Sequence, residues 1–402
     1  MAFFVDFVAV GFFFYSYGVF FKAIATEFGD SRLGVALGLT VTSAVGAIVS
    51  PMVGRALDRY PLKRIIGLGA TSMAVGFMLL SLVQTQWQFY LVIGLFIGFG
   101  AMSMGQLATS KLVTNWFDRR RSTALGIAAT GVSLSGVFMP AISAELISSY
   151  GWRNGFLIYG LFTLFVVVPL VLRFVVSRPE DVGLHPDGAL DWNEGAQHHE
   201  IPPPHLGAVV RGLNFWVLAT GFALIFCCMS ATLTHMVPRV TDLGHSLALA
   251  SLVMSLCAGL GVVGKLTFGW LGDRWGIRTN MWVIIAIQFV GQFVMYTNDT
   301  LAWFAFGAAL FGMGVGGVVP LQAMAVGKTF GRERFGAVLG LIRPAQFPIQ
   351  IIGVPLAGWI FDRTGSYDLA FQIFLGLYVV AAIAWLFYQP PSLANRASET
   401  AT

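Results

Sequence analysis

Two basic side chains lie deep inside stretches of the sequence that are otherwise apolar. Lys265 stands eight residues before Asp273, the first charge of the following loop, which is about 12 Å along a helix. Arg343 stands in "GLIRPAQF", and Gln346 follows it at i+3, on the same face of a helix. A cation at such a depth in a membrane is costly and marks a functional site by default. Each either snorkels to the surface or binds a group of opposite charge.

The acidic residues supply no evident counter-charge. Asp6 and Glu145 are the acids inside the apolar stretches away from loop motifs, and each lies near the end of its stretch. Two cations that face one cavity repel each other or hold an anion between them. We therefore predict that Lys265 and Arg343 hold a substrate anion. Pro344 is expected to break or kink the helix, so that freed carbonyl groups line the cavity.

Other polar groups in the apolar stretches give weaker signals. His235 in "ATLTHMVP" is a candidate substrate ligand or proton carrier, and a solvent-facing histidine at the membrane interface is the alternative. Lys111 lies close to the arginines at 119–121 and is expected to snorkel to the cytoplasmic face. The glycine runs "GLFIGFGAMSMG" and "FGMGVGGVVP" follow no strand, so we interpret them as close helix packing. No metal-ligand spacing is present, and neither a metal nor a cofactor is predicted.

The elements that must position these residues are helices that span a membrane. Of 402 residues, 56% are hydrophobic and 11% charged, and the mean hydropathy is +0.76. A soluble domain would carry about a quarter charged residues. Apolar stretches long enough to cross a bilayer recur along the chain. We predict an all-α polytopic membrane protein with twelve spans, at about 3–27, 33–57, 63–83, 87–115, 121–148, 154–176, 211–236, 246–271, 278–297, 301–328, 334–361 and 367–388.

The basic residues indicate how the chain is oriented. Of the 24 Lys and Arg, one set of alternate loops, with the central linker, holds 15, and the opposite set holds five, Lys22, Arg32, Arg153, Arg239 and Arg363. Positive residues favour the cytoplasmic side. We therefore expect both termini in the cytoplasm, and we attribute the pI of about 9.2 to topology rather than to a nucleic-acid partner. No cleavable signal peptide is expected, because Met1 leads directly into the first span.

The sequence divides into two repeated halves. A polar segment rich in Pro, Gly and His, with His198 and His199, has no helical periodicity and is expected to be a tether. We predict a six-helix bundle at 1–176, a cytoplasmic linker at 177–210, a second six-helix bundle at 211–390 and a cytoplasmic tail at 391–402. "GRALDRYPLK" from Gly54 matches "GWLGDRWGIR" from Gly269, 215 residues later. Such a duplication is typical of transporters whose site lies near the midplane between the halves.

This repeated loop motif, G-x-x-x-D-R-x-G-x-[RK], resembles the signature of the major facilitator superfamily, although Pro61 replaces its glycine in the first copy. The stretches "YGVFFKAIATEFG", "NWFDRRRSTALGIAATG", "YGWRNGF" and "RPEDVGLHPDG" resemble bacterial relatives of monocarboxylate porters and oxalate/formate antiporters. The resemblance implies the major facilitator fold, a bacterial inner-membrane location and a cytoplasmic latch that holds the outward-open state. The residues that would form this latch are Gly54, Asp58, Arg59, Gly269, Asp273 and Arg274.

The resemblance also implies roles for the polar residues. Porters that resemble this chain carry a cation, usually arginine, four residues before the glycine of the second motif, where Lys265 stands. Animal porters place a lysine where Tyr15 stands, and the antiporters place one at Gln346, one turn after Arg343. A tyrosine hydroxyl can donate to a carboxylate. The aspartate that animal porters place one turn before this cation is replaced by Gly261.

We therefore predict a secondary transporter of a small organic anion, a monocarboxylate such as lactate or pyruvate, that works by alternating access with proton symport. Lys265, Arg343, Tyr15, Gln346 and His235 would bind the substrate, and His235 would couple the proton. The partners expected are the acid, a proton or counter-anion and the lipid bilayer, for a chain that acts as a monomer. Exchange of organic anions, a drug exporter and a non-transporting receptor are the alternatives. No nucleophile–base or metal constellation indicates an enzyme.

Overall fold

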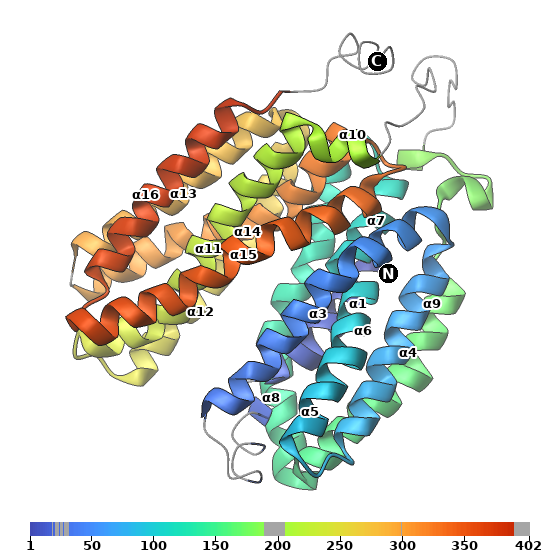
Figure 1. The fold of residues 1–402 in the computed structure, drawn as a ribbon, viewed down its shortest axis with the longest axis horizontal. Helices are drawn as coiled ribbons and strands as arrows, with labels where there is room; N and C mark the ends of the chain where they lie inside the picture. Colours follow the sequence, from blue (N-terminus) through green and yellow to red (C-terminus); the bar gives the residue numbers. More distant parts are fainter. Residues whose placement is uncertain are drawn as a thin grey trace. The chain divides into compact units, whose positions relative to one another are not determined.

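The computed structural model describes residues 1–17, 19–20, 24, 27, 32–188, 206–298 and 300–389. The side chains of 32–37 and 247–248 are not described. The described part is helical, without a strand (Figure 1). The predicted tail at 391–402 and residues 189–205 of the predicted linker, with His198 and His199, lie outside the described residues.

The N-terminal spans are long apolar helices, three of which contain a short π-helical stretch. Their bounds are α1 (Ala2–Val10) with η1 (Gly11–Tyr15), α3 (Arg32–Arg59), α4 (Leu62–Leu80), the run α5 (Gln86–Val92), η2 (Ile93–Gly98), α6 (Phe99–Met104) and α7 (Gln106–Trp116), and the run α8 (Arg121–Phe162), η3 (Thr163–Val167) and α9 (Val168–Phe174). The last run has 54 residues, about 80 Å of helix and more than twice a bilayer core. It breaks at Gly151, whose φ of 77° disfavours any side chain.

Short helices in the linker lead to six further spans. These are η4 (Pro179–Val182), η5 (Pro186–Gly188) and α10 (Leu206–Arg211), followed by α11 (Leu213–Asp242), α12 (Leu247–Arg274), α13 (Ile277–Thr297), α14 (Leu301–Phe330), α15 (Phe335–Thr364) and α16 (Asp368–Leu386). Ten described helices are long and apolar enough to cross a membrane. The break at Gly151 divides one of these in two, and the shorter apolar helix Ala2–Tyr15 adds the first. Eleven of the twelve predicted spans are therefore helices of this length, and the first, at 3–27, is described only in part.

The chain forms two compact units, Met1–Asp118 with Ala128–Trp192 and Arg332–Leu341, and Arg119–Ile127 with Asn193–Gly331 and Ile342–Thr402. The first turns of α8 therefore belong with the C-terminal helices, and the first turns of α15 belong with the N-terminal helices. Each of these helix starts follows a basic loop, "FDRRR" and "GRERF". Both exchanged segments contact the loop motifs described below.

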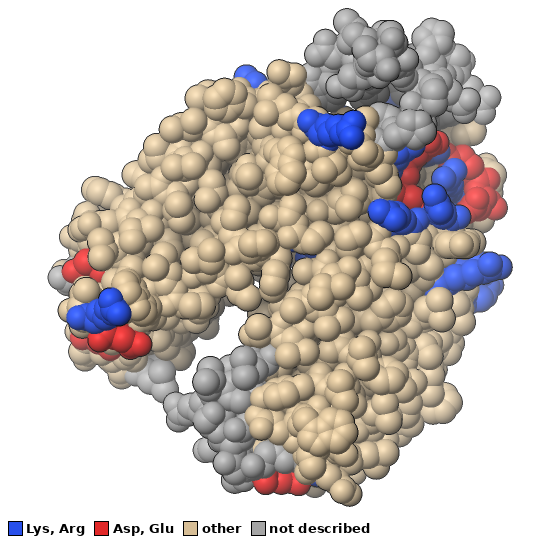
Figure 2. Space-filling model, viewed as in Figure 1, with Lys and Arg blue, Asp and Glu red and all other residues tan. Residues whose placement is uncertain are grey.

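The outer surfaces of the units are apolar. Large side chains such as Leu95, Val137 and Phe165 are more than half exposed, whereas a soluble protein rarely exposes many of these together. On the face shown in Figure 2, most charged side chains lie toward the ends of the units, and most of the remaining surface is uncharged. Lipid is the solvent that suits such a surface. The chain is a multi-pass membrane protein.

Glycines bring α12 and α14 into backbone contact. A Cβ added at Gly312 would lie 2.0 Å from the carbonyl oxygen of Cys257, and one at Gly316 would lie 2.0 Å from that of Gly261. No side chain fits at either position. The interpretation of "FGMGVGGVVP" as close helix packing is therefore confirmed. The Cβ at Gly316 would also lie 2.8 Å from the backbone nitrogen of Lys265, so α14 packs directly beside that lysine.

Candidate functional site

Lys265 lies on the protein-facing side of α12. Its side chain is 9% exposed, whereas its neighbours Val263 and Leu266 are each 47% exposed. A lipid-facing lysine would be exposed like these neighbours. Gly126, in the first turns of α8, also comes so close to α12 that an added Cβ would lie 2.5 Å from the carbonyl oxygen of Lys265. The ammonium group therefore belongs to the protein interior and not to the lipid.

Arg343 lies about 12 Å inside α15, counted from Phe335. Its Nε is buried and has no hydrogen-bond acceptor among the described residues. Pro344 follows it and cannot donate to the carbonyl of Gly340. That carbonyl does not line a cavity as predicted, because the hydroxyl of Ser50 lies 2.9 Å from it and donates to it. The same hydroxyl lies 2.9 Å from the carbonyl oxygen of Ala47 in α3. That carbonyl has no helical donor, because the residue four positions later is Pro51.

Gln346 is held by a second glutamine that the sequence did not single out. Nε2 of Gln322, in α14, donates to Oε1 of Gln346 at 3.2 Å. The two side chains are 5% and 4% exposed. The amide oxygen of Gln346 accepts this hydrogen bond from Gln322. The Nε2 donors of Gln346 find no acceptor among the described residues. Arg343 and Gln346, at i and i+3, thus present buried donors and no free acceptor, an arrangement suited to an anion.

We predict that Gln322→Leu raises about fivefold the KM for the organic anion that the sequence predicts as substrate, with a smaller change in maximal rate. The substitution leaves the amide oxygen of Gln346 buried without a donor, which costs about 1–3 kcal/mol, and frees the amide to rotate. Gln322→Glu should raise KM further, because a carboxylate repels the anion and cannot donate. Gln292→Leu is the matched control, since that buried amide pairs with Thr232 and the Phe371 carbonyl instead. Equal KM values for wild type and Gln322→Leu, measured by initial uptake rates, would contradict this role.

Tyr15 belongs to the N-terminal unit, at the end of the π-helical η1. Its ring packs against Gly136 of α8, where an added Cβ would lie 2.8 Å from it, and edge-on against Phe14. Its hydroxyl makes no hydrogen bond with the described residues and can donate to a ligand. Because π-helical turns are frequent at functional sites, the geometry is compatible with the predicted role, which stays a prediction.

His235 is separated from Arg343 and Gln346. Its Nε2 lies 3.1 Å from the carbonyl oxygen of Val354, which is eleven residues and about 16 Å beyond Arg343 along α15. Since a carbonyl only accepts, Nε2 carries the proton of the neutral ring, and Nδ1, at 3.2 Å, accepts from the hydroxyl of Tyr367. Burial raises the pKa of Tyr367, so this hydroxyl keeps its proton. Direct contact of His235 with an anion at Arg343 is not part of this arrangement.

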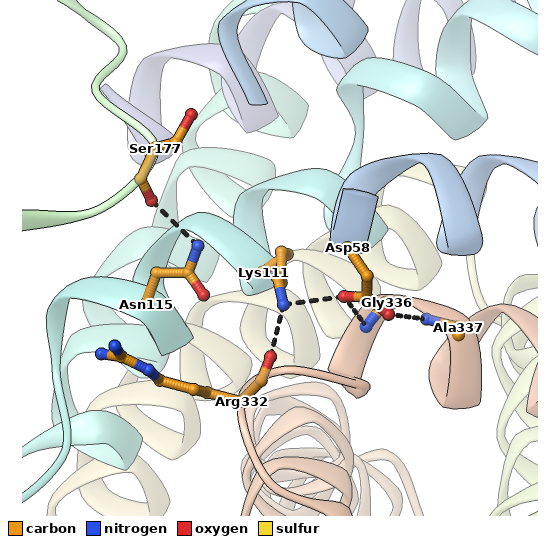
Figure 3. Close-up of polar contacts among 7 residues, drawn as sticks. All are labelled: Asp58, Lys111, Asn115, Ser177, Arg332, Gly336 and Ala337. Atoms are coloured by element: carbon orange, nitrogen blue, oxygen red, sulfur yellow. Dashed lines mark hydrogen bonds and ion pairs between the residues drawn. The ribbon is translucent and has the colours of Figure 1, made fainter. Parts of the chain in front are cut away.

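Asp58 of the first loop motif caps the N-terminus of α15 (Figure 3). Its Oδ1 accepts from the amide of Gly336 at 3.0 Å, and its Oδ2 accepts from that of Ala337 at 2.7 Å. Nζ of Lys111 lies 2.7 Å from Oδ1 and also donates to the carbonyl of Arg332. Lys111 is 2% exposed, so the expectation that it snorkels to the cytoplasmic face is wrong. The carboxylate binds a helix N-terminus and a buried cation at once.

Asp273 of the second motif makes the equivalent cap on α8. Its Oδ1 accepts from the amide of Ser122 at 2.8 Å, and its Oδ2 accepts from the amide and the hydroxyl of Thr123 at 2.9 and 2.6 Å. The two motif glycines permit the close approach. A Cβ at Gly54 would lie 2.1 Å from the Gly336 carbonyl oxygen, and one at Gly269 would lie 3.0 Å from that of Ser122.

The two motif arginines lie outside these caps. Arg59 is exposed, and Arg274 stacks over the ring of Trp270 at 3.7 Å. In the linker, Glu180 pairs with Arg332 at 2.7 Å. Burial opposes ionisation of Glu180, but the hydrogen bond and charge of Arg332 outweigh it and lower the pKa of this carboxyl. The linker "RPEDVG" therefore binds the loop that precedes α15. The latch role of the motif residues stays a prediction.

A protein-family model described as Major Facilitator Superfamily matches residues 3–348. The chain belongs to the major facilitator superfamily. Monocarboxylate transporter 12-B of Danio rerio is 24% identical over 396 residues, covering 92% of this chain and 81% of the relative. The uncharacterized MFS-type transporter YcxA of Bacillus subtilis is 25% identical over 381 residues, covering 91% and 89%. The solved bacterial homologue of the iron transporter ferroportin has a TM-score of 0.72 at 12% identity, covering 96% and 98%, which shows the fold.

As a member of the major facilitator superfamily, the chain is a membrane transporter of small molecules and not an enzyme.

Sequence reasoning missed Gln322, the pairing of Lys111 and the burial of Asp6, which is 2% exposed. The only signal for Gln322 was a single amide in the apolar stretch "GGVVPLQAMAVG". Asp6 lies near the end of its predicted span, which makes it inconspicuous in the sequence, although intramembrane acids merit a functional hypothesis.

Proposed function

We propose that this major facilitator superfamily member transports a small monocarboxylate, of the lactate or pyruvate kind, together with a proton by alternating access. The observation that carries the proposal is the pair of buried donors, Arg343 Nε and Gln346 Nε2, which find no acceptor among the described residues. Lys265 adds a buried cation on α12. In our proposal these three residues bind the carboxylate, and Tyr15 contributes its hydroxyl and an aromatic wall for an apolar end.

The charge of the ligand follows from this donor set. A carboxylate accepts a charge-assisted hydrogen bond from each donor, and such bonds are about twice as strong as neutral ones. Cationic drugs would meet repulsion from both basic side chains, which argues against the drug exporter. The relative of Danio rerio is named a monocarboxylate transporter, and this name supports the same substrate class here.

Exchange of organic anions is the second candidate. The observation that favours it is the position of His235, our coupling candidate. His235 contacts Val354, which lies about 16 Å from Arg343 along α15. In proton symport through His235, the proton and the acid would therefore bind at separate places. We further propose a monomer in a bacterial inner membrane. The bias of basic residues among the loops supports a cytoplasmic location for both termini.

Uptake into proteoliposomes tests this proposal. Labelled lactate, pyruvate, formate and oxalate are offered to the reconstituted protein, with and without an inward proton gradient. We expect uptake of at least one monocarboxylate to rise several-fold with the gradient and to collapse with a protonophore. Uptake only against preloaded anion would identify an exchanger. If no acid moves under either condition, the organic-anion proposal is wrong.

A further inference from the structure

A buried carboxylate lies within the first span. Asp6 of α1 is 2% exposed, and Oγ1 of Thr109 in α7 donates to its Oδ1 at 2.8 Å. Thr109 lies seven residues, or about 10 Å, before the end of α7 at Trp116. Asp6 is therefore held inside the bundle and not at its rim. A carboxylate in such a place is costly to keep charged, and such groups form proton relays in pumps and transporters.

Thr109 has two acceptors within reach. Its Oγ1 also lies 3.4 Å from the carbonyl oxygen of Gly105, the residue at which the helix breaks between α6 and α7, with ψ of −156°. When Asp6 is ionised, Thr109 donates to it. When Asp6 is protonated, its own hydroxyl can donate to Thr109, and Thr109 can turn its proton to Gly105. Both protonation states of Asp6 thus keep a hydrogen bond, which is what a group that takes up and releases a proton requires.

The charged and titratable side chains on the elements packed against α1 within its unit are few. The elements packed on α1 within its unit are η1, α6, α7 and the part of α8 beyond residue 127. Lys111 of α7 is held by Asp58 at 2.7 Å, and α6 carries no charged residue. The remaining titratable or charged side chains on these elements are Tyr15 of η1 and Glu145, Tyr150, Arg153 and Tyr159 of α8. Of these, Glu145 lies 14 residues, or about 21 Å, beyond Gly131, the α8 residue at Phe3.

We propose that Asp6 is the group that binds and releases the transported proton, with Thr109 as its hydrogen-bond switch. The inference rests on the proton symport proposed above and assigns its proton to Asp6 instead of His235. The carboxylate takes one proton from water on one side of the membrane and returns it to water on the other. No bond of the transported acid is made or broken.

Asp6→Asn tests this assignment in the reconstituted full chain. We expect uptake of labelled acid driven by an inward proton gradient to fall at least about tenfold. Exchange of external labelled acid against the same unlabelled acid inside should stay within about twofold of wild type, because exchange needs no net proton transfer. Glu145→Gln is the matched control, an exposed acid of α8 whose loss should leave both assays unchanged.

Three results would overturn the inference. If Asp6→Asn accumulates acid with the gradient as wild type does, Asp6 is not the proton site, and the symport proposal survives. If wild type itself shows exchange but no response to the gradient, the symport proposal fails and this assignment fails with it.

A milder variant covers the case in which Asp6→Asn does not fold. Thr109→Val should move the midpoint of uptake against pH upward, because the ionised carboxylate loses a donor, whereas Thr109→Ser should keep the wild-type midpoint. An unchanged midpoint in Thr109→Val would also count against the assignment.

Discussion

Replacing Lys265 by alanine is expected to lower uptake of the transported acid about a hundredfold or more. The side chain is 9% exposed on the protein-facing side of α12, so the carboxylate that we propose it binds would lose a partner that water does not replace. Removing one partner of a buried charge pair costs about 3–5 kcal/mol, and each 1.4 kcal/mol changes an equilibrium constant about tenfold. Initial uptake rates at a fixed, low acid concentration measure this loss.

Two variants separate charge from packing. Lys265→Arg keeps the cation and should retain at least about a tenth of the wild-type rate, since arginine is the usual residue of the porters that this chain resembles. Leu266→Ala removes a neighbouring side chain that is 47% exposed, and it should transport as wild type does. The thermal midpoint of each purified variant serves as the folding control. Normal uptake by a folded Lys265→Ala would show that the lysine is structural, and the anion site would then rest on Arg343 and Gln346 alone.

The fold was predictable because a bilayer imposes a length on apolar helices. Twelve stretches of about 20 apolar residues specify twelve spans, since backbone groups in lipid must be satisfied within the helix. The turn at Gly151 was predicted by position, between the spans at 121–148 and 154–176, although the helical run continues on both sides of it. The π-helical stretches and the exchange of helix starts between the units were not predictable, because both depend on contacts between distant segments.

The site was predictable where a charge interrupts an apolar sequence. Lys265 and Arg343 stand out in this way, and the side chain of Lys265 and the Nε atom of Arg343 are buried. The partners of polar groups were not predictable, because they come from other helices. Ser50, 290 residues from Gly340, takes the carbonyl that Pro344 frees. Gln322 orients Gln346 from α14. Neither partner carries a charge or a motif that would mark it in the sequence.

The second large effect is expected from Asp58→Asn. This change keeps the shape of the side chain but removes the charge that faces the N-terminus of α15 and the ammonium of Lys111. An amide cannot accept from both Gly336 and Ala337 and also neutralise Lys111. A buried cation that loses its partner costs about 3–5 kcal/mol, and the helix terminus adds up to about 1 kcal/mol. We expect the thermal midpoint to fall by roughly 5 °C or more.

A double substitution identifies the cause. Asp58→Asn with Lys111→Met removes both charges, so the cost of an unpaired buried cation disappears and most of the stability should return, a coupling that a double-mutant cycle measures. Asp273→Asn is the matched control, because Asp273 also caps a helix with two amides but has no ion pair in the described part of the chain. It should lose only the cap, about 1–2 kcal/mol. If Asp273→Asn and Asp58→Asn are equally destabilised, and Lys111→Met rescues nothing, the aspartates act only as caps. Lys111 would then have no part in holding the first turn of α15.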